Sequence, residues 1–383
     1  MTQQPLQLPD HTQMLVACLL SFVASAVLYP GYIKWLKQRQ VEQFLREDGP
    51  QSHAHKAKTP TMGGLVFGIV TSVVSLAVLL LMNASAKPLD SSVVIVGLIC
   101  GGIGFIDDFA KFRQKNNKGI SGYIRLGSEL LLGLMLGALI IFSSSETIFV
   151  PFAEQIAAVA GGHAASFAGT HLGIWGPPAL LFIPLAGFLI AATANSLNLH
   201  DGMDGLAAGT SCQVFAALAL MLFATGQHSL ALISACAAGA LCGFILFNKN
   251  PARIFMGDTG SLFIGGLMGA LVVCGGLVVW FIPLSLVYIF EALSVMIQVT
   301  VFKLTKKLEG EEKMNPLKVV ITKLTKRVPG EGKRVFRMAP LHHHYEAVWA
   351  EKGVPEWQVV AGFWVAQTIL CLGTCVLFFT YLK

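Results

Sequence analysis

Acidic residues and one run of histidines stand out in an otherwise apolar chain. They are Asp107, Asp108, Asp201, Asp204, Asp258, His342, His343 and His344. Carboxylates can bind Mg²⁺ or accept protons, and histidines can contact phosphate groups or transfer protons. Each cluster lies just beyond an apolar stretch of membrane-spanning length. Ionisable groups are expensive in bilayer hydrocarbon, so their repeated placement at such ends predicts one shared polar site.

The composition is typical of an all-α polytopic membrane protein. Of 383 residues, 54% are hydrophobic and 13% are charged, and the mean hydropathy is +0.67. A soluble α/β protein would not repeat apolar runs so often with so few charges. Ten runs approach the ~20 residues that cross a bilayer. The expected spans are 14–33, 62–82, 92–106, 126–142, 177–197, 205–224, 231–247, 260–280, 282–302 and 357–381. The third is short, which predicts a helix that ends in a polar cavity.

The distribution of basic residues predicts the topology of this single transmembrane domain. Of the 27 lysines and arginines, all but Lys87 and Lys383 lie in four loops. With the 198–204 turn, these give the expected cytoplasmic segments 34–61, 107–125, 198–204, 248–259 and 303–356. Basic loops face the cytoplasm, so both termini are expected outside. All the acidic and histidine clusters then share the cytoplasmic face. The outer 143–176 segment offers no chemistry, only a possible strand at 147–152.

The pair Asp107-Asp108 follows three glycines and precedes a basic stretch. Adjacent carboxylates repel each other, and such a pair persists most readily where Mg²⁺ binding or proton transfer uses it. An ordinary solvated helix end is the alternative. The glycines more readily indicate close helix packing than a dinucleotide site, because no strand precedes them.

The turn from Asn198 to Gly205 places Asp201, Gly202 and Asp204 between two apolar runs. It lacks the closing Glu and most other ligands of a calcium loop, so a nucleotide or metal-phosphate site is favoured. A capped turn in which Asp204 starts the next helix is the alternative.

Two further polar stretches could bind a nucleotide diphosphate. In the turn from Asn248 to Ser261, Asp258 lies among small residues and Phe255 offers a ring for base stacking; a helix-capping Asp258 is the alternative. Lys56 and the hydroxyl of Thr61 precede a helix start, where an anion is favoured. The topology rule explains Lys56 equally well.

Three consecutive histidines cannot all point the same way on a helix, so the two-ligand zinc spacing of four residues is not met. Phosphate contact, orientation or proton transfer suits His342, His343 and His344 better. Glu291 and Gln298 lie seven residues, or two turns, apart in the ninth span. We expect a structural role for Glu291 and a substrate contact for Gln298.

The motifs at 59–64, 105–108, 198–205, 255–261 and 336–344 resemble, in wording and order, those of the phospho-N-acetylmuramoyl-pentapeptide transferase (MraY) family. This family is part of the polyprenyl-phosphate N-acetylhexosamine-1-phosphate transferase superfamily, and the match runs from about residue 30 to the last span. The resemblance implies ten helices and transfer of phospho-MurNAc-pentapeptide from UDP-MurNAc-pentapeptide to undecaprenyl phosphate, giving lipid I and UMP in peptidoglycan synthesis. It also implies Mg²⁺ dependence and a homodimer in the bacterial inner membrane, without a nucleic-acid partner.

The same resemblance implies roles for single residues. Asp258 would bind Mg²⁺, and Asp107 or Asp108 would deprotonate or orient the lipid phosphate, or also bind the metal, with His342 as a further catalytic residue. Substrate contacts are implied for Lys56, Thr61, Asn198, Asp201, Gly202, Asp204, Asn248, Phe255, Gln298, His342, His343 and His344. A single displacement and a two-step route through an aspartyl nucleophile both fit the sequence.

Two other functions fit part of the pattern. A related transferase of N-acetylglucosamine phosphate would share most motifs, but the histidine motif separates the families. A secondary transporter would place ionisable pairs near the bilayer centre in repeated halves, whereas here they lie at the ends of the apolar runs.

The chain departs from the family pattern at two places. His200 stands where the family usually has Thr, and about two dozen residues, 309–332, are inserted before the histidine motif. Within the insertion, apolar residues fall on one helical face and basic residues elsewhere. They are Leu317, Val320, Ile321, Leu324 and Val328, against Lys318, Lys323, Lys326 and Arg327. We hypothesise a basic amphipathic helix on the inner leaflet, with a solvated loop as the alternative.

Overall fold

The fold is a bundle of long apolar helices. The computed structural model describes residues 10–39, 59–81, 88–114, 119–142, 163–167, 171–175, 180–308, 315–326 and 328–382. Ten of the described helices are long and apolar enough to cross a membrane. They are α1 (Asp10–Gln38), α2 (Gly64–Leu81), α3 (Pro88–Gln114), α4 (Gly122–Phe142), α7 (Phe182–His200), α8 (Leu206–Ala224), α9 (His228–Asn248), α10 (Gly257–Cys274), α12 (Leu286–Leu304) and α15 (Glu356–Tyr381).

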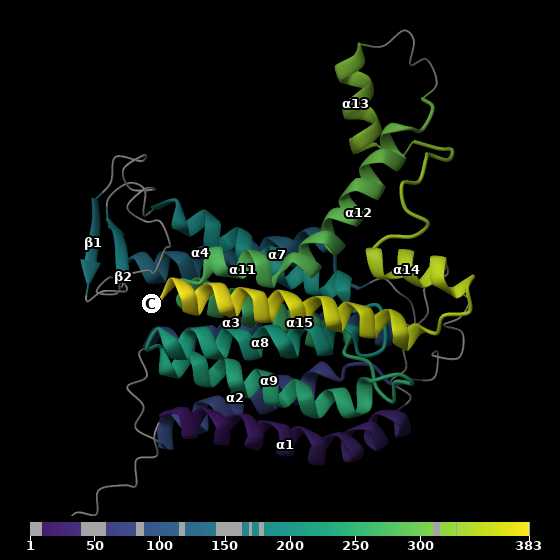
Figure 1. Cartoon of the computed structure of the whole chain (residues 1–383). Coiled ribbons are helices and arrows are strands. Elements are labelled where there is room, and N and C mark those ends of the chain that lie inside the picture. Colours follow the sequence, from purple (N-terminus) through teal and green to yellow (C-terminus); the bar gives the residue numbers. More distant parts are fainter. Residues whose placement is uncertain are drawn as a thin grey trace, which may run out of the picture.

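Five short elements accompany these spans in the described part of the chain. They are α11 (Val278–Leu284), α13 (Pro316–Thr325), α14 (Leu341–Ala350) and the antiparallel strands β1 (His163–Phe167) and β2 (His171–Trp175). Figure 1 shows the β-hairpin and the C-terminal end of α15 at one end, and α14 at the other. In the same view α12 leaves the bundle at an angle, and α13 stands across its far end.

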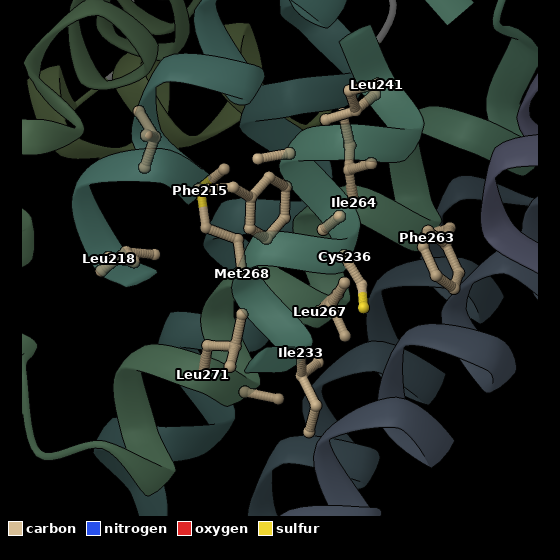
Figure 2. Packing of buried hydrophobic residues seen from close by; sticks show 14 of the residues in the cluster. Phe215, Leu218, Ile233, Cys236, Leu241, Phe263, Ile264, Leu267, Met268 and Leu271 are labelled. Atoms are coloured by element: carbon tan, nitrogen blue, oxygen red, sulfur yellow. The ribbon is translucent and has the colours of Figure 1, made fainter. Parts of the chain in front are cut away.

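Helix α10 lies at the centre of the apolar core. Along α10, Phe263, Ile264, Leu267, Met268 and Leu271 are almost completely buried. Figure 2 shows them packed with Phe215 and Leu218 of α8 and with Ile233, Cys236 and Leu241 of α9. Helices α3, α7 and α2 also pack on α10. Because the helix that begins with Gly257-Asp258 is enclosed on all sides, its first turn is held in a fixed position.

Glycines let α10 approach its neighbours closely. A Cβ atom at Gly104 of α3 would overlap the backbone of Asp258, and one at Gly64 of α2 would overlap Gly260. Small residues at such crossings are how membrane helices gain packing contacts without a hydrophobic driving force between them. These contacts place the ends of α2 and α3 directly beside the start of α10.

The ten expected spans are confirmed, with two differences in their limits. The third span is not short: α3 runs 27 residues and carries Asp107 and Asp108 inside the helix. The hydropathy pattern ends the span at 106 because the charges of Asp107 and Asp108 lower the hydropathy. The helix continues because neighbouring polar groups bind these two carboxylates. The expected ninth span, 282–302, is divided between α11 and α12, with Ser285 between them.

Two local predictions have different outcomes. The possible strand at 147–152 lies outside the described residues, and the β1–β2 hairpin further along was not predicted. A helix in the insertion is confirmed: α13 begins after Asn315, whose side chain accepts a hydrogen bond from the Leu317 amide at 2.9 Å. Val328 lies beyond this helix and is buried, contrary to the expected apolar face. The orientation of the termini stays a prediction.

Candidate active site

The carboxylate of Asp108 caps the start of α10. It accepts hydrogen bonds from the backbone amides of Asp258 at 3.2 Å and Thr259 at 2.9 Å, and from the Thr259 hydroxyl at 2.7 Å. The first amides of a helix have no partner within it, so a carboxylate supplied by another helix stabilises this end. Thr61 and Asp108 both lie beside Gly257, which has a positive φ of 74°. Asp108 therefore fixes where the side chain of Asp258 begins.

Asp107 and Asp258 converge on one cation. The Lys111 ammonium lies 2.5 Å from Asp107 Oδ2 and 2.7 Å from Asp258 Oδ2. Asn198 donates to Asp258 Oδ1 at 2.7 Å, and Arg125 lies 3.5 Å from Oδ2. Side chains from α3, α4, α7 and α10 thus meet at one point.

Lys111 and Arg125 were not assigned to the site from the sequence. The four-residue spacing between Asp107 and Lys111 is a recognisable signal, because residues that far apart share a helix face. Arg125 carried no such signal: only the packing of α4 against α7 and α10 brings it to Asp258.

The two aspartates in the turn between α7 and α8, Asp201 and Asp204, have different surroundings. Burial of Asp201 and the negative charges of Asp258 and Asp108 raise the pKa of Asp201 to about 8. Asp204 faces away and accepts from the Asn250 side chain at 3.1 Å and the Ala252 amide at 3.0 Å. The charges of the acidic centre thus act on Asp201, whereas Asp204 holds the adjoining loop.

The loop before α10 is held by its own polar groups. Asn248 accepts from the Gly205 amide at 3.1 Å and donates to the Ile254 carbonyl at 3.0 Å. The backbone of Phe255 pairs with Pro60 and Gly63, and its ring is half-buried. Lys56 lies outside the described residues.

The three histidines have three different hydrogen-bond partners, although the ring centroids of His342 and His343 lie 4.2 Å apart. The fully buried His342 faces Glu291, which accepts from the His342 amide at 3.2 Å and lies 3.1 Å from its Nδ1. His343 pairs with Glu346 at 2.9 Å, and the Arg337 amide donates to His344 Nδ1 at 3.2 Å. His342 is thus oriented by α12, and its neighbours by α14 and the preceding loop.

Glu291 joins His342 to the turn before α8. His200 Nδ1 lies 3.4 Å from Glu291 Oε1, and its Nε2 lies 3.2 Å from the Thr210 hydroxyl. A Cβ atom at Gly202 would also overlap the ring of His342. Glu291 thus holds two histidines in place, which is the structural role expected for it. One of them, His200, is the residue that departs from the family pattern.

Gln298 holds the backbone that precedes the histidines. Its Oε1 accepts from the amides of Val335 and Phe336 at 2.9 and 3.0 Å, and its Nε2 donates to the Phe336 carbonyl at 3.0 Å. Direct substrate contact by Gln298 stays a prediction. In this structure the Gln298 side chain positions the loop that leads into α14.

The acidic centre fits a divalent cation. Mg²⁺ prefers oxygen ligands and is held by one or two carboxylates together with substrate phosphates. Asp107 and Asp258 offer that donor set and already direct one oxygen each at a positive charge. His200, Glu291 and His342 form a second group whose ligand atoms lie within 4.8 Å of one another, but its nitrogen donors suit zinc better than Mg²⁺.

Comparison with known proteins gives consistent matches. The model of glycosyl transferase family 4 matches residues 91–276, and signature 1 of phospho-N-acetylmuramoyl-pentapeptide-transferase matches residues 56–67. Proteins of that name are similar over nearly the whole chain. The one from Acaryochloris marina is 36% identical over 96% of this chain and 85% of its own length. Those from Clostridium botulinum and Shouchella clausii are 36% and 34% identical, over 94% and 95% of this chain and 94% and 97% of theirs.

Proposed function

The chain belongs to the phospho-N-acetylmuramoyl-pentapeptide-transferase family, and from that premise we propose how its residues act. It is a multi-pass membrane protein that transfers phospho-MurNAc-pentapeptide from UDP-MurNAc-pentapeptide to undecaprenyl phosphate. The products are lipid I and UMP, in the first membrane step of peptidoglycan synthesis. We propose that it acts in the bacterial inner membrane, as a homodimer, with Mg²⁺ as cofactor.

The convergence of Asp107, Lys111 and Asp258 at one end of the spans supports the proposed mechanism most directly. The reaction joins a lipid phosphate to a water-soluble nucleotide sugar, so it needs a polar site at the membrane boundary. Phosphoryl transfer depends mainly on positioning and on neutralising negative charge. Asp258 and Asp107 would hold Mg²⁺, which neutralises the diphosphate when bound, while Lys111 and Arg125 supply positive charge from the protein.

Asp107 and Asp108 have separate tasks in this proposal. Asp108 places both carboxylate oxygens on the first turn of α10, so it positions Asp258 and is poorly placed to receive a proton. Asp107 Oδ2 faces the Lys111 ammonium at the acidic centre. We therefore assign to Asp107 the contact with the attacking phosphate of undecaprenyl phosphate.

The assay that tests this function supplies UDP-MurNAc-pentapeptide, undecaprenyl phosphate and Mg²⁺ to purified protein and measures UMP. We expect UMP release that requires both substrates, stops on addition of a chelator and returns with excess Mg²⁺. UDP-N-acetylglucosamine serves as the control donor. Faster release from that donor would overturn the substrate assignment, and full activity in chelator would overturn the metal proposal alone.

The replacement Glu291→Gln tests whether Glu291 acts through His342. The neutral amide would still fill the space, but one of the two histidines would face an N–H group instead of an acceptor. We expect kcat to fall about tenfold to a hundredfold, the range that misplacement of a catalytic group produces, with KM for the nucleotide nearly unchanged.

Thr374→Val removes a buried hydroxyl from α15, far from the histidines, and serves as the control. If Glu291→Gln lowered the melting temperature but left kcat at the wild-type value, Glu291 would be a packing residue only.

A further inference from the structure

A basic pocket lies between α12 and the inserted helix α13. Its volume is about 350 Å³. It is lined by Gln298, Val299, Phe302, Val328 and five basic residues, which are Lys303, Lys306, Lys323, Lys326 and Arg334. A pocket with this lining favours an anion whose remainder is apolar.

Three of the four lysines are held in place by backbone carbonyls at, or just beyond, the ends of helices. Lys303 donates to the Leu324 carbonyl at 3.1 Å, and Lys323 donates to the Leu304 carbonyl at 3.2 Å. Lys306 donates to the Val328 carbonyl at 2.9 Å. An ammonium has three donors, so the single bonds of Lys303 and Lys306 fix these groups and leave donors for an anion. The charges are thus preorganised around the pocket.

Helix α13 presents an apolar stripe away from the protein. Val319 and Lys323, one turn apart, are its buried residues and pack toward α12. Leu317, Val320 and Ile321 are 68%, 41% and 51% exposed. Val319 lies off the apolar face that contains Leu317, Val320 and Ile321, so it makes the protein contact and leaves that face uncovered.

The position of α13 determines what can cover that face. It stands across the end of the membrane span α12, displaced sideways from the other spans (Figure 1). A helix there, with an apolar stripe and basic residues beside it, has the pattern of helices that lie in the bilayer interface. Negatively charged headgroups attract such basic clusters.

We propose that the α12–α13 pocket binds the phosphate of an anionic phospholipid in the leaflet on the active-site side. Leu317, Val320 and Ile321 lie among the acyl chains of that leaflet, and Lys326 and Arg334 close the pocket around the phosphate. The inference does not depend on the transferase reaction, because lipid binding can be measured without substrates.

Lys326→Gln combined with Arg334→Gln tests the site without touching the lysines that hold the helix ends. Purified full-length protein is mixed with phosphatidylglycerol and phosphatidylcholine in detergent, and bound lipid is counted by native mass spectrometry. Each basic residue contributes on the order of 1 kcal/mol to anionic lipid binding, so losing two should lower phosphatidylglycerol retention by about tenfold or more. Phosphatidylcholine retention should not change.

Lys318→Gln combined with Lys333→Gln is the matched control, because it removes two exposed lysines that do not line the pocket. If both double variants lost the same amount of bound phosphatidylglycerol, the loss would follow from the lower overall charge of the protein, and the proposed site would be overturned. A further outcome is that inorganic phosphate alone stabilises the wild-type protein against unfolding but not the pocket variant. If phosphatidylglycerol then added no further stabilisation, the pocket would be a free-phosphate site and the proposal would be overturned. A raised KM for UDP-MurNAc-pentapeptide with unchanged lipid retention would assign the pocket to the nucleotide substrate, and so would also overturn the proposal.

Discussion

Asp258→Asn is expected to lower kcat for UMP release by about 10²–10³-fold or more, the range seen when one preorganised electrostatic group is removed. Asparagine has nearly the same shape, and its carbonyl can still accept from Asn198. It lacks the negative charge that meets Lys111 and that would hold Mg²⁺. The first turn of α10 depends on Asp108 and not on the Asp258 side chain, so the melting temperature should change little.

Asp10→Asn provides the control, because Asp10 is exposed and lies beside His228 at the start of α9, the opposite end from the site. UMP release within twofold of wild type from Asp258→Asn would remove Asp258 from the reaction centre.

Asp108→Asn should abolish turnover and also destabilise the protein. The asparagine amide would place N–H groups against the donors of Asp258 and Thr259, so at least one buried amide would lose its acceptor. An unsatisfied buried group costs about 1–3 kcal/mol. Thermal unfolding in detergent and UMP release measure the two effects separately.

Asp107→Asn is the informative comparison for this variant. It should also lose turnover, but with a smaller change in melting temperature, because Asp107 accepts one backbone hydrogen bond, from Ile120, whereas Asp108 accepts two. A larger loss of stability for Asp107→Asn than for Asp108→Asn would reverse the two assigned roles.

The spans and the common location of the clusters could be predicted because both follow from local sequence. Hydropathy over ~20 residues reflects the bilayer thickness, and turns between consecutive spans must lie at one end or the other. The different hydrogen-bond partners of His342, His343 and His344 could also be predicted, because helical geometry separates consecutive side chains, although the ring centroids of His342 and His343 stay 4.2 Å apart.

The partners of these residues could not be predicted, because they join distant parts of the chain. Asp108 contacts a helix that begins about 150 residues later, and Glu291 meets His342 some 50 residues on. Nothing local distinguishes an aspartate that caps another helix from one that binds a substrate. For the same reason Asn248 and Gln298, whose amides hold backbone, resemble ligand-binding residues in the sequence.

The enclosure of α10 has a consequence for the membranes in which the protein can work. In α10, 83% of the spanning window is buried, against 22–28% in α1, α4, α12 and α15. A change in bilayer thickness acts on helices that touch acyl chains, by tilting them or moving their ends. The carboxylate at the start of α10 is therefore insulated from lipid composition, whereas α12, which orients His342 through Glu291, is exposed to it. A thicker bilayer should disturb the alignment of His342 before it disturbs Asp258.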